Sequence, residues 1–141
     1  MTVLRNFVAT VILVFVSAIG AAGADSFPLD RELLLDAQPM RPGKRIPSIT
    51  VTTNGSVAID LWCKSVGGRV ELGENSIAIV PDALPEALPA WQSAGQCTPQ
   101  RMQADESLLA AIAQATEWRR QGDAIVLSGG PAPLRFRGAT N

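Results

Sequence analysis

A period-two pattern that begins at Ile49 constrains the fold of this chain more than any other feature. Apolar residues alternate with polar ones as far as Thr52, and the alternation resumes after Asn54-Gly55 and continues to Cys63. Successive side chains of a strand point to opposite faces, so this segment predicts a hairpin with one buried face. Asn-Gly is a frequent pair in the turns of such hairpins.

Parity decides the length of the hairpin loop. A two-residue Asn54-Gly55 loop would pair Val51 with Ala58 and would divide the apolar residues between the two faces. A three-residue loop, 53–55, pairs Val51 with Val57 and places the glycine at the left-handed position of a G1 bulge. We therefore expect the three-residue loop, because a slip of one residue would expose a whole apolar face.

The same parity, continued along the second strand, separates two neighbouring residues. It places Cys63 on the core face, in line with Val57, Ile59 and Leu61, and it directs Trp62 to the outer face. Cys63 should then be reachable by a partner from another segment, and Trp62 should be open to contact.

Other short runs with period two lie at 69–72, 77–80, 125–127 and 134–137. Their spacing indicates an antiparallel meander of five or six strands. The segment Arg31–Ala37 fits either a strand with Leu33 and Leu35 inward or a helical turn after Asp30, and the sequence leaves both open.

One helix is predicted, from Glu106 to Gln121. Asp105 suits its N-cap, Arg119 and Arg120 suit the negative end of its dipole, and Gly122 suits its stop. Its apolar residues recur at helical spacing and favour packing on the sheet: Leu108, Leu109, Ile112, Ala115 and Trp118. The fold class expected is therefore α+β, a small twisted antiparallel sheet on one helix in the C-terminal half.

The N-terminal residues are typical of an export signal. Arg5 precedes an uncharged run from Phe7 to Ile19, and Ala22-Gly23-Ala24 offers a small-x-small cleavage site. We predict a signal peptide over 1–24 and one exported domain over 25–141, located in the periplasm and not membrane-bound after cleavage. The alternative is an uncleaved anchor, although the apolar run is short for a membrane span.

The chain has two cysteines, Cys63 and Cys97. An exported protein enters an oxidising compartment, where disulfides form and persist, so the sequence favours a bond between them. In the chain-entropy model such a bond stabilises by roughly 3 to 4 kcal/mol. Two buried thiols or a redox pair are the alternatives, but a thiol oxidoreductase usually has a C-x-x-C motif.

Catalytic chemistry finds little support. The chain has no histidine, so Ser-His and Cys-His arrangements are impossible, and a metal site lacks ligands. Asp60, Glu71 and Glu74 are better explained as solvated strand and turn residues than as a catalytic pair. No glycine-rich phosphate loop is present, and the net charge of −1 gives no case for nucleic acid. We expect no enzyme activity and no cofactor.

The order of these features resembles the META domain family of heat-shock-associated bacterial envelope proteins. The residues that carry the resemblance are Cys63 with Gly68, Cys97, 105–112 with Trp118, Gly122-Asp123, Leu127, Leu134 and Phe136. The resemblance covers about 27–137. It implies a small twisted antiparallel sheet packed on one helix, and it implies no established reaction.

Two stretches depart from the family pattern. Trp62-Cys63-Lys64 stands where the family commonly has Gly-Cys-Asn, and 94–96 differ from the residues that usually precede the second cysteine. A turn or binding role of that asparagine would not be preserved by Lys64.

These observations favour a monomeric, non-catalytic envelope protein that binds an envelope partner or small ligand, or protects under stress. Trp62 and Trp91 are the candidate contacts, because aromatic residues are enriched at binding centres. The alternative is a periplasmic inhibitor of a secreted hydrolase such as a lysozyme or protease. The proline-rich loop from Pro81 to Met102 would then be the inserting element.

Overall fold

A computed structural model describes residues 26–40, 45–88 and 97–139. The expected signal peptide, 1–24, and Trp91 lie outside these residues. Eight strands and one helix follow one another along the described chain: β1 (Glu32–Leu35), β2 (Ser48–Val51), β3 (Ser56–Asp60), β4 (Ser65–Leu72), β5 (Ile77–Pro81), α1 (Pro99–Gln114), β6 (Glu117–Gln121), β7 (Ala124–Ser128) and β8 (Leu134–Gly138). In this part of the chain, no helix is long and apolar enough to cross a membrane.

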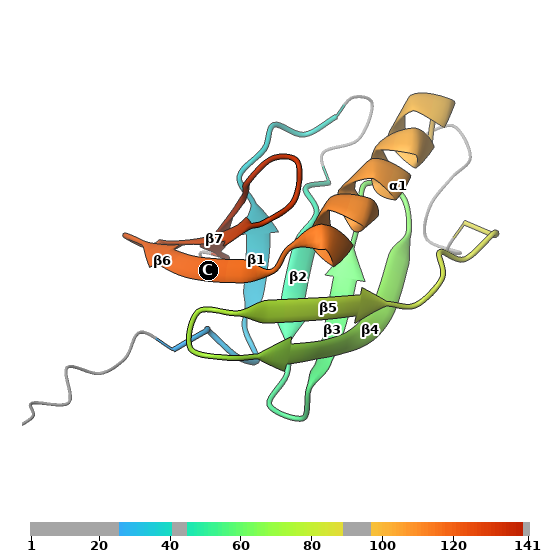
Figure 1. Ribbon diagram of the computed structural model, residues 1–141. Helices are drawn as coiled ribbons and strands as arrows, with labels where there is room; N and C mark the ends of the chain where they lie inside the picture. Colours follow the sequence, from blue (N-terminus) through green and yellow to red (C-terminus); the bar gives the residue numbers. More distant parts are fainter. Residues whose placement is uncertain (1–25, 41–44, 89–96, 140–141) are drawn as a thin grey trace, which may run out of the picture.

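The strands form one antiparallel sheet in the order β5-β4-β3-β2-β1-β8-β7-β6. Its two ends approach each other, since the N–H of Ile77 donates to the carbonyl of Thr116 at 3.0 Å and that of Trp118 donates to Asn75 at 2.9 Å. The sheet therefore curls into a nearly closed barrel (Figure 1). The α+β class is confirmed, but the strand count of five or six is wrong.

The first additional strand is β1, the segment whose conformation the sequence left open. Leu33 pairs with Ile49 of β2 on one side and with Gly138 of β8 on the other. Its side chain is buried in the core, so β1 joins the two halves of the meander.

The hairpin of β2 and β3 has the predicted register. Val51 pairs with Val57, and Ile49 pairs with Ile59. The N–H of Thr52 donates to the carbonyl of Ser56, so these two residues close the hairpin and 53–55 form its loop. Gly55 has a φ of 82°, the left-handed conformation that the three-residue loop requires.

The helix begins earlier than the sequence predicted. α1 starts at Pro99, and its N-cap is Thr98, whose Oγ1 accepts a hydrogen bond from the N–H of Arg101. Proline suits the first helical position because its missing N–H would have no partner there. Asp105, the expected N-cap, instead lies inside the helix and is buried.

The helix also ends earlier. After Gln114 the backbone becomes extended, and Arg119 and Arg120 belong to β6, which pairs with β7. Gly122, with a φ of 62°, lies in the turn between these strands and does not end a helix. The correction has a tertiary cause, because pairing with the apolar β7 fixes a polar segment that has weak strand character of its own.

The core fills the barrel from both ends. α1 lies across one end, where Leu108 and Ile112 join the inward residues of the strands (Figure 1). Near the other end, Phe27 is buried and its ring meets that of Trp118 edge-on, with centroids 5.3 Å apart.

Candidate functional site

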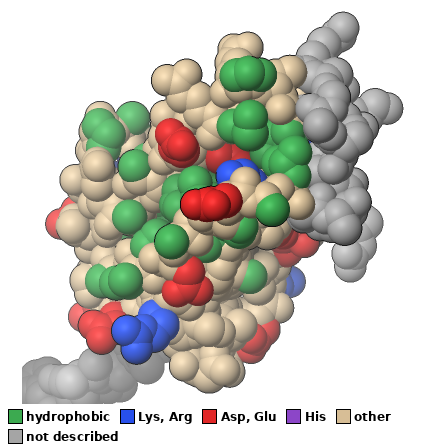
Figure 2. All heavy atoms as spheres, turned by 90° about the vertical axis from the view of Figure 1, so that its right-hand side faces the viewer, with side chains coloured by type: hydrophobic (Ala, Val, Ile, Leu, Met, Phe, Trp, Pro, Cys, Tyr) green, Lys and Arg blue, Asp and Glu red, His purple; other side chains and the backbone are tan. Residues whose placement is uncertain are grey.

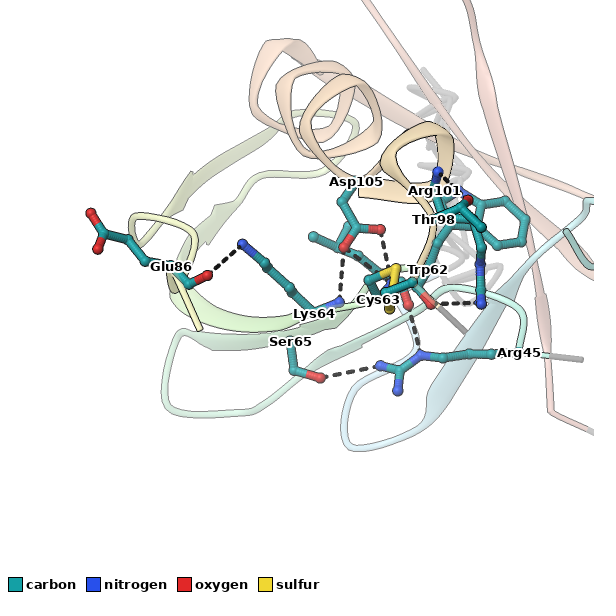
Figure 3. The surroundings of a disulfide bond; sticks show 11 residues. Arg45, Trp62, Cys63, Lys64, Ser65, Glu86, Thr98, Arg101 and Asp105 are labelled. Carbon is teal, nitrogen blue, oxygen red and sulfur yellow. Dashed lines mark hydrogen bonds between the residues drawn. A yellow bond between two sulfur atoms is a disulfide. The ribbon is translucent and has the colours of Figure 1, made fainter. Parts of the chain in front are cut away.

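A cluster of charged and polar groups surrounds the disulfide (Figure 3). Cys63, in the connection between β3 and β4, is bonded to Cys97, which immediately precedes the N-cap of α1. Both residues are buried and their Cα atoms are 5.7 Å apart. The structure thus contains the predicted disulfide, and it joins the start of the helix to the sheet.

Asp105 makes a second link between the same two elements. Its carboxylate accepts hydrogen bonds from the backbone N–H of Cys63 at 3.0 Å and from that of Lys64 at 2.8 Å. The residue is only 1% exposed. Because these N–H groups belong to a turn, the carboxylate replaces partners that a strand would have supplied.

Opposing effects act on the pKa of Asp105. Burial raises it most strongly, while the N–H groups of Lys64, Cys63 and Trp62 and the charge of Arg45 lower it. The net direction is upward, because desolvation penalises the charged form more than these contacts favour it. Such a pKa occurs in catalytic acids, but it also occurs in structural networks.

Two arginines hold the carbonyl groups of the same connection. Arg101, 1% exposed, donates from Nη2 to the carbonyl of Trp62 at 2.9 Å. Arg45 donates from Nε to the carbonyl of Leu61 at 2.7 Å, and its Nη2 lies 3.3 Å from the carboxylate of Asp60. Burial lowers the pKa of Arg45 against the opposing charge of Asp60. The cluster therefore clamps the β3–β4 connection to α1 and to the segment before β2.

Trp62 does not lie on an outer face as parity predicted. It is 7% exposed, and Leu61 and Cys63 on either side are fully buried. Strand β3 ends at Asp60, and the N–H of Leu61 donates to the carbonyl of Lys64 at 2.8 Å in a tight turn. Alternation stops where the strand stops, so Trp62 offers little surface to a partner.

Two hollows lie near the other end of the barrel, beside the segment 26–29. One, of about 520 Å³, is lined by residues that include Pro28, Arg31, Arg120 and Asp123. The other, of about 280 Å³, is lined by residues that include Phe27, Leu72, Glu74 and Trp118. Asp105 lines neither hollow, so the buried acid and these recesses are separate features.

The three carboxylates considered as a catalytic set are divided between the two ends of the barrel. Asp60 accepts a hydrogen bond from Ser65 at 2.6 Å and pairs with Arg45 near the disulfide. Glu71 lies at the far end of β4, and Glu74 lies in the turn that follows. Within the described residues, no group of three or more acidic or cysteine side chains is placed to hold a metal ion.

Sequence reasoning missed the clamp formed by Arg45, Arg101 and Asp105. One signal was available, because Asp105 stands three and seven residues before Leu108 and Ile112 and therefore shares their helical face. An acid on an apolar helix face predicts a buried, hydrogen-bonded carboxylate. Taking Asp105 as an N-cap removed it from that face.

Neither a family model nor a curated protein sequence matches this chain. Among solved structures, it is similar to an NMR structure of a protein from Burkholderia xenovorans, with a TM-score of 0.54 and 16% identity over 80% of this chain and 84% of that one. A second NMR structure has a TM-score of 0.52 and 14% identity, over 76% of this chain and 87% of that one. A crystal structure of a DUF4847 family protein from Bacteroides vulgatus has a TM-score of 0.44 and 12% identity, over 64% of this chain and 57% of that one.

The first two similarities, at these low identities, show a shared fold alone. The fold and the cluster together define a small antiparallel barrel whose one helix is attached by a disulfide and a buried aspartate.

Proposed function

We propose that this chain is an exported, non-catalytic binding module of the cell envelope, with residues 25–141 forming a META-like domain in the periplasm. One observation carries the proposal. Asp105 resembles a catalytic acid in its burial and its raised pKa, but its carboxylate oxygens accept hydrogen bonds from the backbone N–H groups of Cys63 and Lys64. A carboxylate held in this way stabilises a turn, and because Asp105 is buried and lines neither of the two hollows described above, it is not placed to meet a substrate there.

The META resemblance is supported by how its residues meet. Cys63 and Cys97 are bonded, and Asp105, which opens the helical motif of the resemblance, contacts the residue after the first cysteine. Lys64 takes part through its backbone N–H, so the family asparagine is not needed for this contact. Export is supported by the disulfide, because such bonds persist in oxidising compartments.

Partner capture tests the binding role. The mature chain, 25–141, would be crosslinked in native envelope extract, and captured proteins would be identified by mass spectrometry. A contact at Trp91 predicts that Trp91→Ala reduces capture several-fold, whereas Gln92→Ala leaves it unchanged. A wild-type chain that enriches no protein over beads that carry no chain would contradict the binding role.

A hydrolase inhibitor is the second candidate, and the attachment of the proline-rich segment favours it. This segment leaves β5 after Pro81, and the disulfide of Cys97 attaches its far end to the sheet. A segment attached at both ends has less entropy to lose on binding than a free tail of the same length. Figure 2 shows hydrophobic side chains at several places on the face of the molecule that it views. Val80, at the end of β5, is 63% exposed. Assays with lysozyme and common proteases test this role, and full activity at micromolar protein would exclude those enzymes.

A further inference from the structure

The hollow of about 520 Å³ has an apolar floor. Leu33 of β1 and Ile125 of β7 line it, and both side chains belong to the core. Gly138 of β8 pairs with Leu33 and also lines the hollow. A Cβ atom at Gly138 would meet no atom within 4 Å, so the glycine leaves open space beside this floor. The mouths of β-barrels are frequent ligand sites, and this volume lies in the usual range of ligand pockets.

Charges of both signs stand around this floor. Arg31, just before β1, and Asp123, in the turn between β6 and β7, line the hollow and are exposed. Neither side chain makes a hydrogen bond or an ion pair with another described residue. The two opposite charges thus share one hollow without contact between them, which leaves both for a molecule that carries the complementary pair.

The other two charged residues of the lining have different roles. Arg120 donates from Nη2 to the carbonyl of Ser26 at 3.0 Å and so joins β6 to the segment before β1. Glu32 adjoins the buried Leu33, so alternation directs its carboxylate to the outer face of the barrel. Its carbonyl accepts a hydrogen bond from the N–H of Ala139 at 3.1 Å. The acid that faces a ligand in this hollow is therefore Asp123.

We propose that this hollow binds a small zwitterion with an apolar body, of the class of a short apolar peptide with both ends free. Its carboxylate meets Arg31, because guanidinium groups bind carboxylates through paired hydrogen bonds. Its ammonium group meets Asp123, and its apolar side chains lie over Leu33 and Ile125.

The separation of the two charges favours a peptide over a single amino acid. The ends of an extended dipeptide are about 7 Å apart, whereas both charges of an amino acid are attached to one carbon atom. Arg31 and Asp123 line the same hollow but do not touch, which suits the longer molecule. The inference rests on the proposed role as a binding module and adds a ligand class to it.

An NMR titration of the isotope-labelled mature chain with leucyl-leucine tests the site. We expect saturable shifts of the amide signals of Leu33 and Asp123 at millimolar peptide. Arg31→Gln and Asp123→Asn should each weaken binding by about tenfold, because a hydrogen bond to a charged group is lost. Arg31→Lys keeps the charge and should restore part of the affinity. Arg69→Gln is the matched control, since Arg69 is an exposed arginine of β4 that does not line the hollow, and its affinity should match the wild type.

A steric variant and two modified peptides test the same site independently. Gly138→Leu should fill the open space and abolish binding, while its thermal melt shows that the chain still folds. N-acetyl-leucyl-leucine lacks the ammonium group, and leucyl-leucine amide lacks the carboxylate. Each should bind about tenfold more weakly than the free peptide, because one charged contact is missing.

Equal affinity for the free and the acetylated peptide would overturn the inference, since a carboxylate alone would then suffice. A folded Gly138→Leu variant that binds like the wild type, equal losses in Arg31→Gln and Arg69→Gln, or no shifts at millimolar peptide would overturn it as well. Absence of peptide binding in a chain that still captures an envelope protein would reject the hollow alone. Absence of capture by a chain that binds the peptide would reject the envelope partner and leave the hollow in place.

Discussion

Asp105 shows how one side chain can settle the conformation of a neighbouring element. Its two oxygens accept from Cys63 and Lys64, and Arg101, four residues earlier on the same helix, donates to Trp62. Three successive residues of the β3–β4 connection are thereby held by two side chains of α1. A turn buried in this way needs such partners, because a buried backbone group without one is costly.

We predict that Asp105→Ala lowers the free energy of unfolding by about 2 to 4 kcal/mol, because two buried N–H groups lose their acceptor. Urea denaturation measures the change. Glu106→Ala, at the exposed neighbouring position of the helix, is the control and should stay within about 0.5 kcal/mol. Equal effects of the two substitutions would show that the carboxylate contacts do not hold the turn.

The raised pKa of Asp105 gives a pH dependence with a definite sign. A folded-state pKa above the ordinary value of 3.8 means that the folded chain binds this proton more tightly than the unfolded chain. Stability from this group is therefore greatest below 3.8 and falls as pH rises toward the folded pKa.

Asp105→Asn cannot titrate at this position. We expect the wild-type stability minus that of Asp105→Asn to decrease between pH 3.5 and 7, as measured by urea denaturation at each pH. A difference that instead grows with pH would mean that the N–H donors and Arg45 outweigh burial.

Gly68 is required by the close approach of β5. A methyl group at Gly68 would lie 2.6 Å from the carbonyl oxygen of Val80 and 2.8 Å from Cα of Pro81, and both are backbone atoms. We predict that Gly68→Ala costs about 1 to 3 kcal/mol by forcing β4 and β5 apart. Thermal melts of the two variants measure the effect. The added methyl group of Gly138→Ala would meet no atom within 4 Å, so this control should be neutral.

At the scale of elements, the sequence predicts those strands whose alternation survives in the fold. The β2–β3 hairpin was predicted to its register, because Val51 and Val57 must share a face. β6 was missed because four of its five residues are charged or amide residues, and its strand conformation comes from pairing with β7. Trp62 was misplaced because parity was extended past the end of β3.

The helix start tests this distinction between local and tertiary signals. Thr98 caps α1 through its side-chain oxygen, so Thr98→Ala should lower the free energy of unfolding by about 1 kcal/mol. Thr98→Ser keeps the oxygen and should retain most of the stability in urea denaturation. A loss as large for serine as for alanine would show that the methyl group and not the cap is responsible.

At the scale of the whole molecule, the barrel and its helix depend on a few links of long sequence separation. β5 and β6, which are the two ends of the sheet, meet at an isolated bridge. The start of α1 is attached to the connection between β3 and β4 by the Cys63–Cys97 disulfide and by Asp105. The two cysteines were visible in the sequence, whereas the contacts of Arg45 and Arg101 depend on the path of the chain between them.

The disulfide closes a loop of sequence separation 34, so its removal frees the unfolded chain considerably. We predict that Cys63→Ala/Cys97→Ala lowers the free energy of unfolding by about 3 to 4 kcal/mol in the chain-entropy model. Urea denaturation with and without dithiothreitol separates the bond from the packing of its sulfur atoms. Reductant should destabilise the wild type and leave the double variant unchanged. A wild-type midpoint that is insensitive to reductant under conditions that release two thiols would show that Asp105 and the core hold α1 without the covalent link.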